Sequence, residues 1–192
     1  MQIRCALVGM PGSGKSTVGR HLAQRLKVPF IDLDHQLEQV LKTSIRQFFE
    51  AEGEARFRDI EAQVLAKVTA RPGGMVLSTG GGAVLRPENR EVLRQFGNVL
   101  YLRASPEEIF KRVKHDKTRP LLQGGNPMGK LRDLYAQRDP LYRETAHYVI
   151  ETGRPSVSTL VNMVMMQLEM AQSAVVAAPS TPGTEQPSDT AP

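Results

Sequence analysis

Nine residues near the N-terminus, Gly9-Met10-Pro11-Gly12-Ser13-Gly14-Lys15-Ser16-Thr17, decide which fold this sequence adopts. They match the phosphate-binding loop pattern, and they stand between an apolar strand-like segment, residues 3–8, and a helical segment. Glycines let backbone N–H groups curl round an anion, and the following helix N-terminus adds unpaired donors. The alternative is a glycine-rich turn that binds nothing. Pattern and context together favour a loop around the phosphates of ATP or a similar nucleotide.

Three side chains of this loop suit a nucleotide and its metal ion. Lys15 supplies a cation for the outer phosphates, and Ser16 offers a hydroxyl to Mg²⁺. Thr17 is placed to contact the inner phosphate. We expect the backbone donors of the cradle to include those of Gly12, Ser13 and Gly14.

Two carboxylates, Asp32 and Asp34, follow the second strand-like segment. In an extended segment, residues i and i+2 face the same way, so we expect both carboxylates to point into one space beside the loop. Mg²⁺ and a hydroxyl acceptor could occupy that space. The alternative is a polar strand end at which Asp34 caps a helix.

The rest of the chain alternates between strand-like segments and segments of helical period. This alternation predicts a parallel sheet with helices on both faces, which binds its ligands at the carboxyl ends of the strands. A long polar loop at residues 114–129 precedes a helix expected at 130–145. From about residue 177 the chain is too polar to offset its ordering entropy, so we expect disorder there. The strands are expected at residues 3–8, 29–31, 75–78, 99–102 and 148–150.

Composition narrows the class of protein. The chain has 192 residues, 40% of them hydrophobic, which suits one globular domain. It has no apolar stretch of the ~18 residues that a membrane span needs and no secretory signal pattern. The net charge of +5 could indicate a nucleic-acid surface, but without a recognition motif it favours small anionic ligands and solvated basic faces. The single cysteine, Cys5, excludes an internal disulfide, which favours the cytosol.

Several further candidates are ambiguous when each is taken alone. Arg58 lies in a charged helical segment and could be a surface residue, and Arg119 and Arg138 could be solvated charges. The Gly80-Gly81-Gly82 run after the third strand allows close approach of a ligand, or is only a flexible turn. No acidic residue ends that strand, so Asp32 is the natural substitute as a metal ligand.

Taken together, these residues resemble the shikimate kinase family. The resemblance covers residues 3–168, and its ordered set of motifs is far more specific than the glycine loop alone. It depends on Gly9 to Thr17, Asp32-Leu33-Asp34, Phe57-Arg58, Thr79-Gly80-Gly81-Gly82, Arg119-Pro120-Leu121-Leu122, and Arg138 with Leu141-Tyr142.

The resemblance implies a three-layer α/β/α P-loop kinase with a five-stranded parallel sheet in the order 2-3-1-4-5. It implies a single domain at residues 1–171 with a mobile lid at about 112–125, followed by a disordered tail at 172–192. The implied reaction transfers the γ-phosphate of ATP, with one Mg²⁺, to the 3-hydroxyl of shikimate. That reaction belongs to aromatic amino-acid biosynthesis.

The resemblance also implies roles for particular residues. Lys15, Asp34 and Arg119 are the implied catalytic residues, and Arg119 reaches the ATP phosphates from the lid. Ser16 and Asp32 are the implied metal ligands. Arg112 is expected to pack on the adenine, with Arg154 or its neighbour Pro155 contributing a second contact. The implied shikimate contacts are Asp34, Arg58, Gly80, Gly81, Gly82 and Arg138.

Two other functions fit the glycine loop. One is another small-molecule kinase of the same fold, acting on gluconate or a nucleotide. The other is a nucleotide-binding module without catalysis, although Lys15, Asp34 and Arg119 are all present. We expect a cytoplasmic monomer that binds ATP and shikimate and associates with neither nucleic acid nor membranes.

Overall fold

The computed structural model describes residues 3–114, 125–153 and 155–177. Five parallel strands form one sheet in the order β2-β3-β1-β4-β5, which confirms the predicted order. The central strand β1 is paired on both sides, with Ala6 opposite Leu77 and Val99. The strands are β1 (Arg4–Val8), β2 (Phe30–Asp32), β3 (Met75–Ser78), β4 (Asn98–Arg103) and β5 (Tyr148–Glu151).

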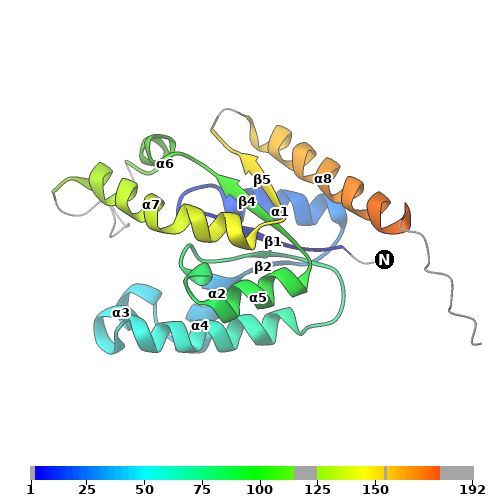
Figure 1. The fold of residues 1–192 in the computed structure, drawn as a ribbon. Coiled ribbons are helices and arrows are strands. Elements are labelled where there is room, and N and C mark those ends of the chain that lie inside the picture. Colours follow the sequence, from blue (N-terminus) through cyan, green and yellow to red (C-terminus); the bar gives the residue numbers. More distant parts are fainter. Residues whose placement is uncertain (1–2, 115–124, 154, 178–192) are drawn as a thin grey trace, which may run out of the picture.

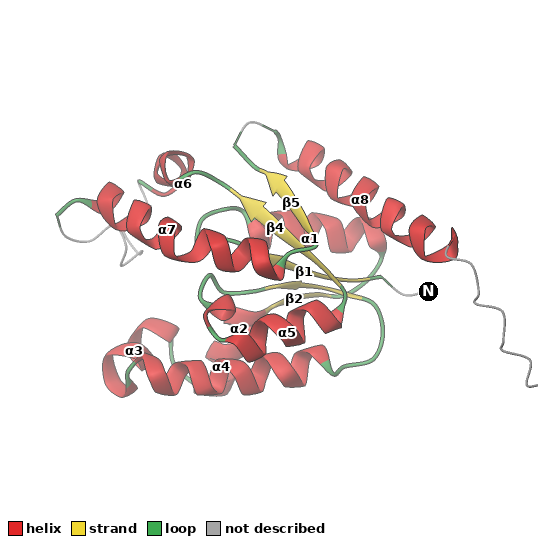
Figure 2. Cartoon of the chain, viewed as in Figure 1, coloured by secondary structure: helices red, strands yellow, loops and turns green. Residues whose placement is uncertain are grey.

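Helices cover both faces of the sheet and give three layers (Figures 1 and 2). One face packs on α1 (Lys15–Leu26) and α8 (Val157–Ala177) through a core that includes Leu7, Leu22 and Val164. The other face packs on the remaining helices through a second core. Those helices are α2 (Leu33–Leu41), α3 (Ile45–Glu52), α4 (Glu54–Thr69), α5 (Pro87–Phe96), α6 (Pro106–Val113) and α7 (Pro127–Thr145), with a 3₁₀ turn η1 (Ala83–Leu85).

Helix starts follow the local chemistry of the sequence. Ser44 and Gln47 form a reciprocal capping box at α3, as their spacing predicts, and Ser105 forms one with Glu108 at α6. Pro87 occupies the first turn of α5, where its missing N–H costs no intrahelical bond.

Two predicted boundaries are wrong, the start of α7 and the start of the tail. Helix α7 begins at Pro127 rather than at 130, because the Asn126 side chain accepts the Gly129 N–H at 2.9 Å and a proline follows it. Residues 112 and 113, where the predicted lid begins, are the last two residues of α6. Helix α8 continues past 171 to Ala177, so the predicted tail begins too early.

No helix in the described part of the chain has both the length and the apolar character that crossing a membrane requires.

Candidate active site

The glycine loop connects β1 to α1, as its pattern predicts. Gly14 caps α1 in the left-handed region with φ 97°, a conformation that glycine adopts without a side-chain clash. The Lys15 side chain is 8% exposed, and its Nζ donates to the carbonyls of Gly9 and Met10, both at 2.9 Å. The lysine charge therefore lies inside the curl of the loop, against backbone oxygens.

A cavity of about 400 Å³ opens over this loop at the carboxyl ends of the strands. The loop forms one wall, and residues from the ends of β2, β3 and α6 form the rest. The cavity is lined by Pro11, Gly12, Gly14, Lys15, Ser16, Thr17, Asp32, Asp34, Thr79, Gly81, Arg112 and Val113.

Asp32 and Asp34 both line this cavity, but not as an extended pair. Asp32 is the last residue of β2 and caps α2, because its Oδ1 accepts the backbone N–H groups of Asp34 at 3.1 Å and His35 at 3.4 Å. Asp34 lies in the first turn of α2. The predicted extended geometry is therefore wrong, and so is the alternative in which Asp34 is the cap. The spacing of Leu33, Leu37 and Leu41 is helical, a signal in the sequence that the extended interpretation did not use.

The second oxygen of Asp32 contacts the glycine loop. The Ser16 hydroxyl donates to Asp32 Oδ2 at 2.6 Å. A hydroxyl and a carboxylate that line one cavity beside the loop form an oxygen-donor pair of the kind that holds Mg²⁺ together with nucleotide phosphates. Among the described residues, no group of three or more His, Cys, Asp or Glu side chains could hold a metal ion, so phosphate oxygens would have to complete such a site.

Burial changes the acid–base character of Asp34. It raises the pKa of the Asp34 carboxyl above its ordinary value of 3.8, and the nearby charge of Lys15 opposes part of that rise. The carboxyl is therefore a stronger base than an exposed aspartate. The charges of Asp32 and Glu38 also raise the pKa of Asp34, and the charge of Arg58 lowers it.

Each glycine of the Gly80-Gly81-Gly82 turn faces a candidate site residue. A Cβ atom at Gly80 would lie 2.5 Å from Asp34 Oδ1. At Gly81 it would lie 2.7 Å from Pro11 Cδ and 3.2 Å from Arg138 Nη1, and at Gly82 it would overlap the Arg58 guanidinium. The turn thus brings Asp34, Arg58 and Arg138 to one place, next to the glycine loop.

Arg58 is held by two carboxylates on its own helix, α4. Its Nη1 donates to Glu61 Oε2 at 2.7 Å and its Nη2 donates to Glu54 Oε1 at 3.0 Å, while its side chain is only 12% exposed. Burial disfavours the guanidinium charge, but Glu61 and Glu54 outweigh burial and raise the pKa of Arg58. Burial also raises the pKa of Glu61, and Arg58 opposes that rise. Arg58 is therefore fixed in position rather than solvated.

Arg112 connects the glycine loop to the end of β5. Its Nη1 donates to the Ser13 carbonyl at 3.2 Å and to Thr152 Oγ1 at 3.4 Å, and its Nη2 donates to the Thr152 carbonyl. Arg112 also lines the cavity. Its guanidinium thus closes the side of the cavity nearest the loop between β5 and α8.

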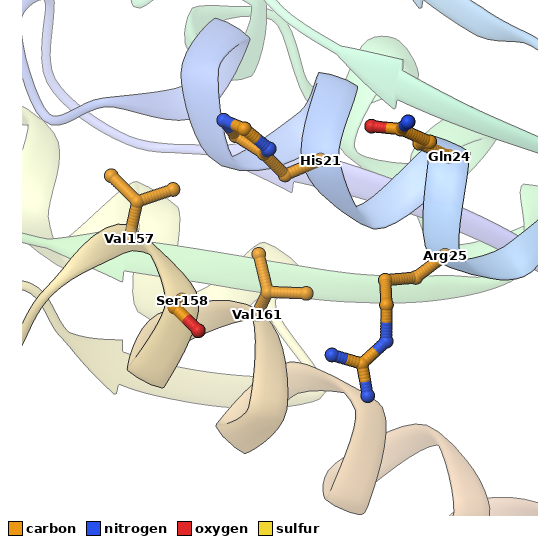
Figure 3. Close-up of a pocket in the computed structure, with 6 residues that line it drawn as sticks. All are labelled: His21, Gln24, Arg25, Val157, Ser158 and Val161. Carbon is orange, nitrogen blue, oxygen red and sulfur yellow. The ribbon is translucent and has the colours of Figure 1, made fainter.

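A second cavity, of about 370 Å³, lies between α1 and α8 (Figure 3). Its walls carry His21, Gln24 and Arg25 from α1 and Val157, Ser158 and Val161 from α8. None of the predicted site residues lines it. Arg25 donates to Asn162 Oδ1 at 3.0 Å, so this arginine joins the two helices.

Two predicted site residues, Arg119 and Arg154, lie outside the described residues, as does most of the predicted lid. The structure brings most of the others to the main cavity, whereas five of them are not among the residues that line it: Ser13, Arg58, Gly80, Gly82 and Arg138. Sequence reasoning assigned no role to four residues that contact this set, although Thr79 and Tyr142 belong to the motifs of the resemblance. Two of them carried a signal, since Glu61 is at i+3 from Arg58 and Tyr142 at i+4 from Arg138. The four are Glu61, Thr79, Tyr142 and Thr152.

Comparison with known proteins decides between the kinases of this fold. The family model described as shikimate kinase matches residues 11–169. The chain belongs to the shikimate kinase family. It is 58% identical over 172 residues to a shikimate kinase of Paracidovorax citrulli, which covers 88% of this chain and 94% of that protein. It is 55% identical over 178 residues to one of Ralstonia nicotianae, with 93% of each chain covered.

A solved structure agrees with this assignment. Shikimate kinase from Acinetobacter baumannii in complex with shikimate superposes with a TM-score of 0.83 at 46% identity, over 90% of this chain and 95% of that chain. The predicted family, fold and ATP-dependent shikimate kinase activity are confirmed. Membership of the shikimate kinase family also decides against the gluconate or nucleotide kinase alternatives and the non-catalytic module.

Proposed function

We propose that this shikimate kinase holds its acceptor between Asp34, Arg58, Arg138 and the turn Gly80–Gly82, beside a nucleotide in the glycine loop. One observation supports this more than any other. The three glycines of the turn face Asp34, Arg138 and Arg58 in order, and Gly81 also faces Pro11 of the glycine loop. The proposed binding sites for the phosphate donor and the phosphate acceptor are therefore adjacent and meet where Gly81 faces Pro11.

The chemistry of shikimate suits these residues. Shikimate is a monoanion with three hydroxyls, and a planar guanidinium pairs with a carboxylate through two parallel hydrogen bonds. Arg58 and Arg138 are proposed to hold that carboxylate. The glycine turn allows the ring to lie close to the backbone, and Asp34 is proposed to accept hydrogen bonds from the ring hydroxyls.

ATP is proposed to lie in the main cavity with its phosphates in the glycine loop. Backbone N–H groups of residues 12–17 and the Lys15 ammonium would surround the phosphates, and Arg112 would bound the adenine side. Ser16 and Asp32 would hold one Mg²⁺. When bound, the ion would neutralise charge on the phosphate oxygens.

The proposed reaction is an in-line phosphoryl transfer. The 3-hydroxyl oxygen forms a bond to the γ-phosphorus, the bond from that phosphorus to the β–γ bridging oxygen breaks, and ADP leaves. The hydroxyl proton passes to Asp34, whose raised pKa makes it a better base than an exposed aspartate. Because the transition state of phosphoryl transfer is loose, we expect positioning and charge to matter more for rate than proton removal.

Four further statements depend on the family resemblance. Arg119 is proposed to reach the ATP phosphates from a lid, and Arg154 or Pro155 to contact the adenine. The kinase domain is proposed to be a single unit that ends where α8 ends. The protein is proposed to be a cytoplasmic monomer.

A coupled assay of ADP release tests the proposed function. The protein is incubated with ATP, Mg²⁺ and one acceptor, which is shikimate, gluconate or a nucleoside monophosphate. We expect release of ADP with shikimate alone, abolished by omission of Mg²⁺. Turnover of gluconate or a nucleotide in preference to shikimate, or ATP binding without turnover of any acceptor, would contradict the proposal.

A further inference from the structure

Tyr142 connects two parts of the proposed acceptor site that are distant in the sequence. It lies on α7, one helical turn after Arg138, and its side chain is fully buried. Its hydroxyl donates to the Gly81 carbonyl at 2.6 Å, across 61 residues of sequence. The same residue therefore contacts the glycine turn and shares a helix face with the proposed carboxylate-binding arginine.

The Tyr142 hydroxyl is a donor at physiological pH. Burial raises the pKa of Tyr142 to about 12, while the charges of Arg138 and Arg58 oppose part of this rise. The phenol thus stays protonated, and its proton is available to the Gly81 carbonyl.

The aromatic ring of Tyr142 is held from its other side. It packs on Tyr101 with ring centroids 5.0 Å apart and planes at 34°. The Tyr101 hydroxyl in turn donates to Asp139 Oδ1 at 2.8 Å. A ring held this way places its hydroxyl at one point, so the Gly81 carbonyl is held at one point as well.

Gly81 has little freedom once its carbonyl is held. Its α-carbon lies against Pro11 of the glycine loop and the Nη1 atom of Arg138. In the described part of the chain the Arg138 Nε atom is buried and has no hydrogen-bond partner, which leaves a donor for a ligand. Displacement of Gly81 would change both the shape of the proposed acceptor site and the position of the Arg138 side chain.

We propose that Tyr142 is a positioning residue for the acceptor, which holds the glycine turn in register with Arg138 through the Gly81 carbonyl. This inference rests on the proposed function, because it assumes that the turn and Arg138 contact shikimate. It assigns Tyr142 an effect on shikimate binding alone. The proposed nucleotide contacts come from the backbone N–H groups of the glycine loop and from Lys15, whereas the Tyr142 hydroxyl donates its proton to Gly81.

The variant Tyr142→Phe tests the inference, because it keeps the ring and removes only the hydroxyl. We expect the KM for shikimate to rise about tenfold, the typical effect of an unsatisfied buried hydrogen-bonding group. We expect kcat to stay within about twofold and the KM for ATP to stay unchanged. The matched control is Thr145→Val, which removes another buried hydroxyl of α7, one that donates to the Leu141 carbonyl at 2.7 Å, and should leave both KM values unchanged.

A tyrosine that only stabilises the core would behave differently. Thermal unfolding of both variants supplies that comparison. A lower Tm for Tyr142→Phe with an unchanged KM for shikimate would overturn the inference, and so would equal increases in the two KM values. Failure of Tyr142→Phe to fold would assign the hydroxyl to the fold itself and would also overturn it.

A double variant gives a second measurement. If Tyr142 acts with Arg138, the effects of Tyr142→Phe and Arg138→Lys on the KM for shikimate should not multiply, since each disrupts the same arrangement. Independent effects would contradict the inference. Failure of the wild-type protein to phosphorylate shikimate would refute the proposed function and this inference with it. Wild-type activity with no effect of Tyr142→Phe would refute the inference alone.

Discussion

The guanidinium of Arg58 lies directly against the α-carbon of Gly82. A Cβ atom at Gly82 would come within 2.5 Å of Arg58 Cζ and Nη1, a separation that real side chains do not show. Because Glu61 and Glu54 hold the guanidinium, it cannot move aside without breaking ion pairs. Arg58 can therefore occupy its observed position only because residue 82, 24 residues later in the chain, is a glycine.

We expect Gly82→Ala to weaken acceptor binding. The added methyl group must displace Arg58 or the turn itself, so the KM for shikimate should rise at least about tenfold, or about 1.4 kcal/mol. The KM for ATP should stay near its wild-type value, because the glycine loop is not touched. Steady-state kinetics with each substrate varied in turn measure both.

The companion variant Arg58→Lys should give the same pattern, since lysine lacks the fork that pairs with a carboxylate. If Gly82→Ala instead raises the KM for ATP and leaves that for shikimate unchanged, Arg58 does not hold the acceptor.

Asp34→Asn should remove the acid limb of the pH–rate profile. Burial raises the pKa of Asp34, so in the wild-type protein the basic carboxylate is lost as pH falls through a value above 3.8. The wild-type kcat should therefore fall on that side, whereas the residual kcat of Asp34→Asn should be flat there. We expect the kcat at neutral pH to fall about 10²- to 10⁴-fold, the usual contribution of general-base help. Retention of the acid limb by the variant would assign it to another group.

Arg112→Ala should affect the nucleotide and spare the acceptor. The variant removes hydrogen bonds to the carbonyls of Ser13 and Thr152 at the cavity wall, so we expect the KM for ATP to rise about tenfold. The control is Arg132→Ala, which breaks only an exposed ion pair with Glu107 and should change neither KM. An effect of Arg112→Ala on shikimate alone would mean that the two sites are assigned the wrong way round.

His147 should make the fold sensitive to acid. Its ring Nδ1 accepts the backbone N–H of Val99 at 3.0 Å, and the backbone N–H of His147 donates to the Val99 carbonyl at 2.8 Å. Burial lowers the pKa of His147 below 6.5, helped by the charge of Arg94. Because the folded pKa is the lower one, the stabilising contribution is present above about pH 6.5 and is lost as pH falls through the folded value.

Urea unfolding between pH 8 and pH 5 tests this expectation. The wild-type midpoint should fall toward pH 5, and that of His147→Gln should fall less, since glutamine does not titrate. Equal slopes for the two proteins would show that other groups cause the acid sensitivity.

Part of the fold and part of the candidate site could be predicted from the sequence by itself. The glycine loop and the strand–helix alternation were predicted, because each depends on residues that are adjacent in the chain or one turn apart. The strand order was predicted from the family resemblance, because the periodicity of the sequence does not indicate which strands are neighbours. The geometry of Asp34 was missed because the hydrogen bonds of Asp32 start a helix where an extended segment was expected.

Only the tertiary structure decided which residues meet. The contacts of Arg58 with Gly82 and of Tyr142 with Gly81 join segments that lie far apart in the chain. Such contacts depend on how the helices pack across the sheet, and packing places no regular spacing in the sequence. Local hydrogen bonding thus determined the loop that surrounds a phosphate, whereas long-range packing determined the shape of the place where the acceptor is proposed to bind.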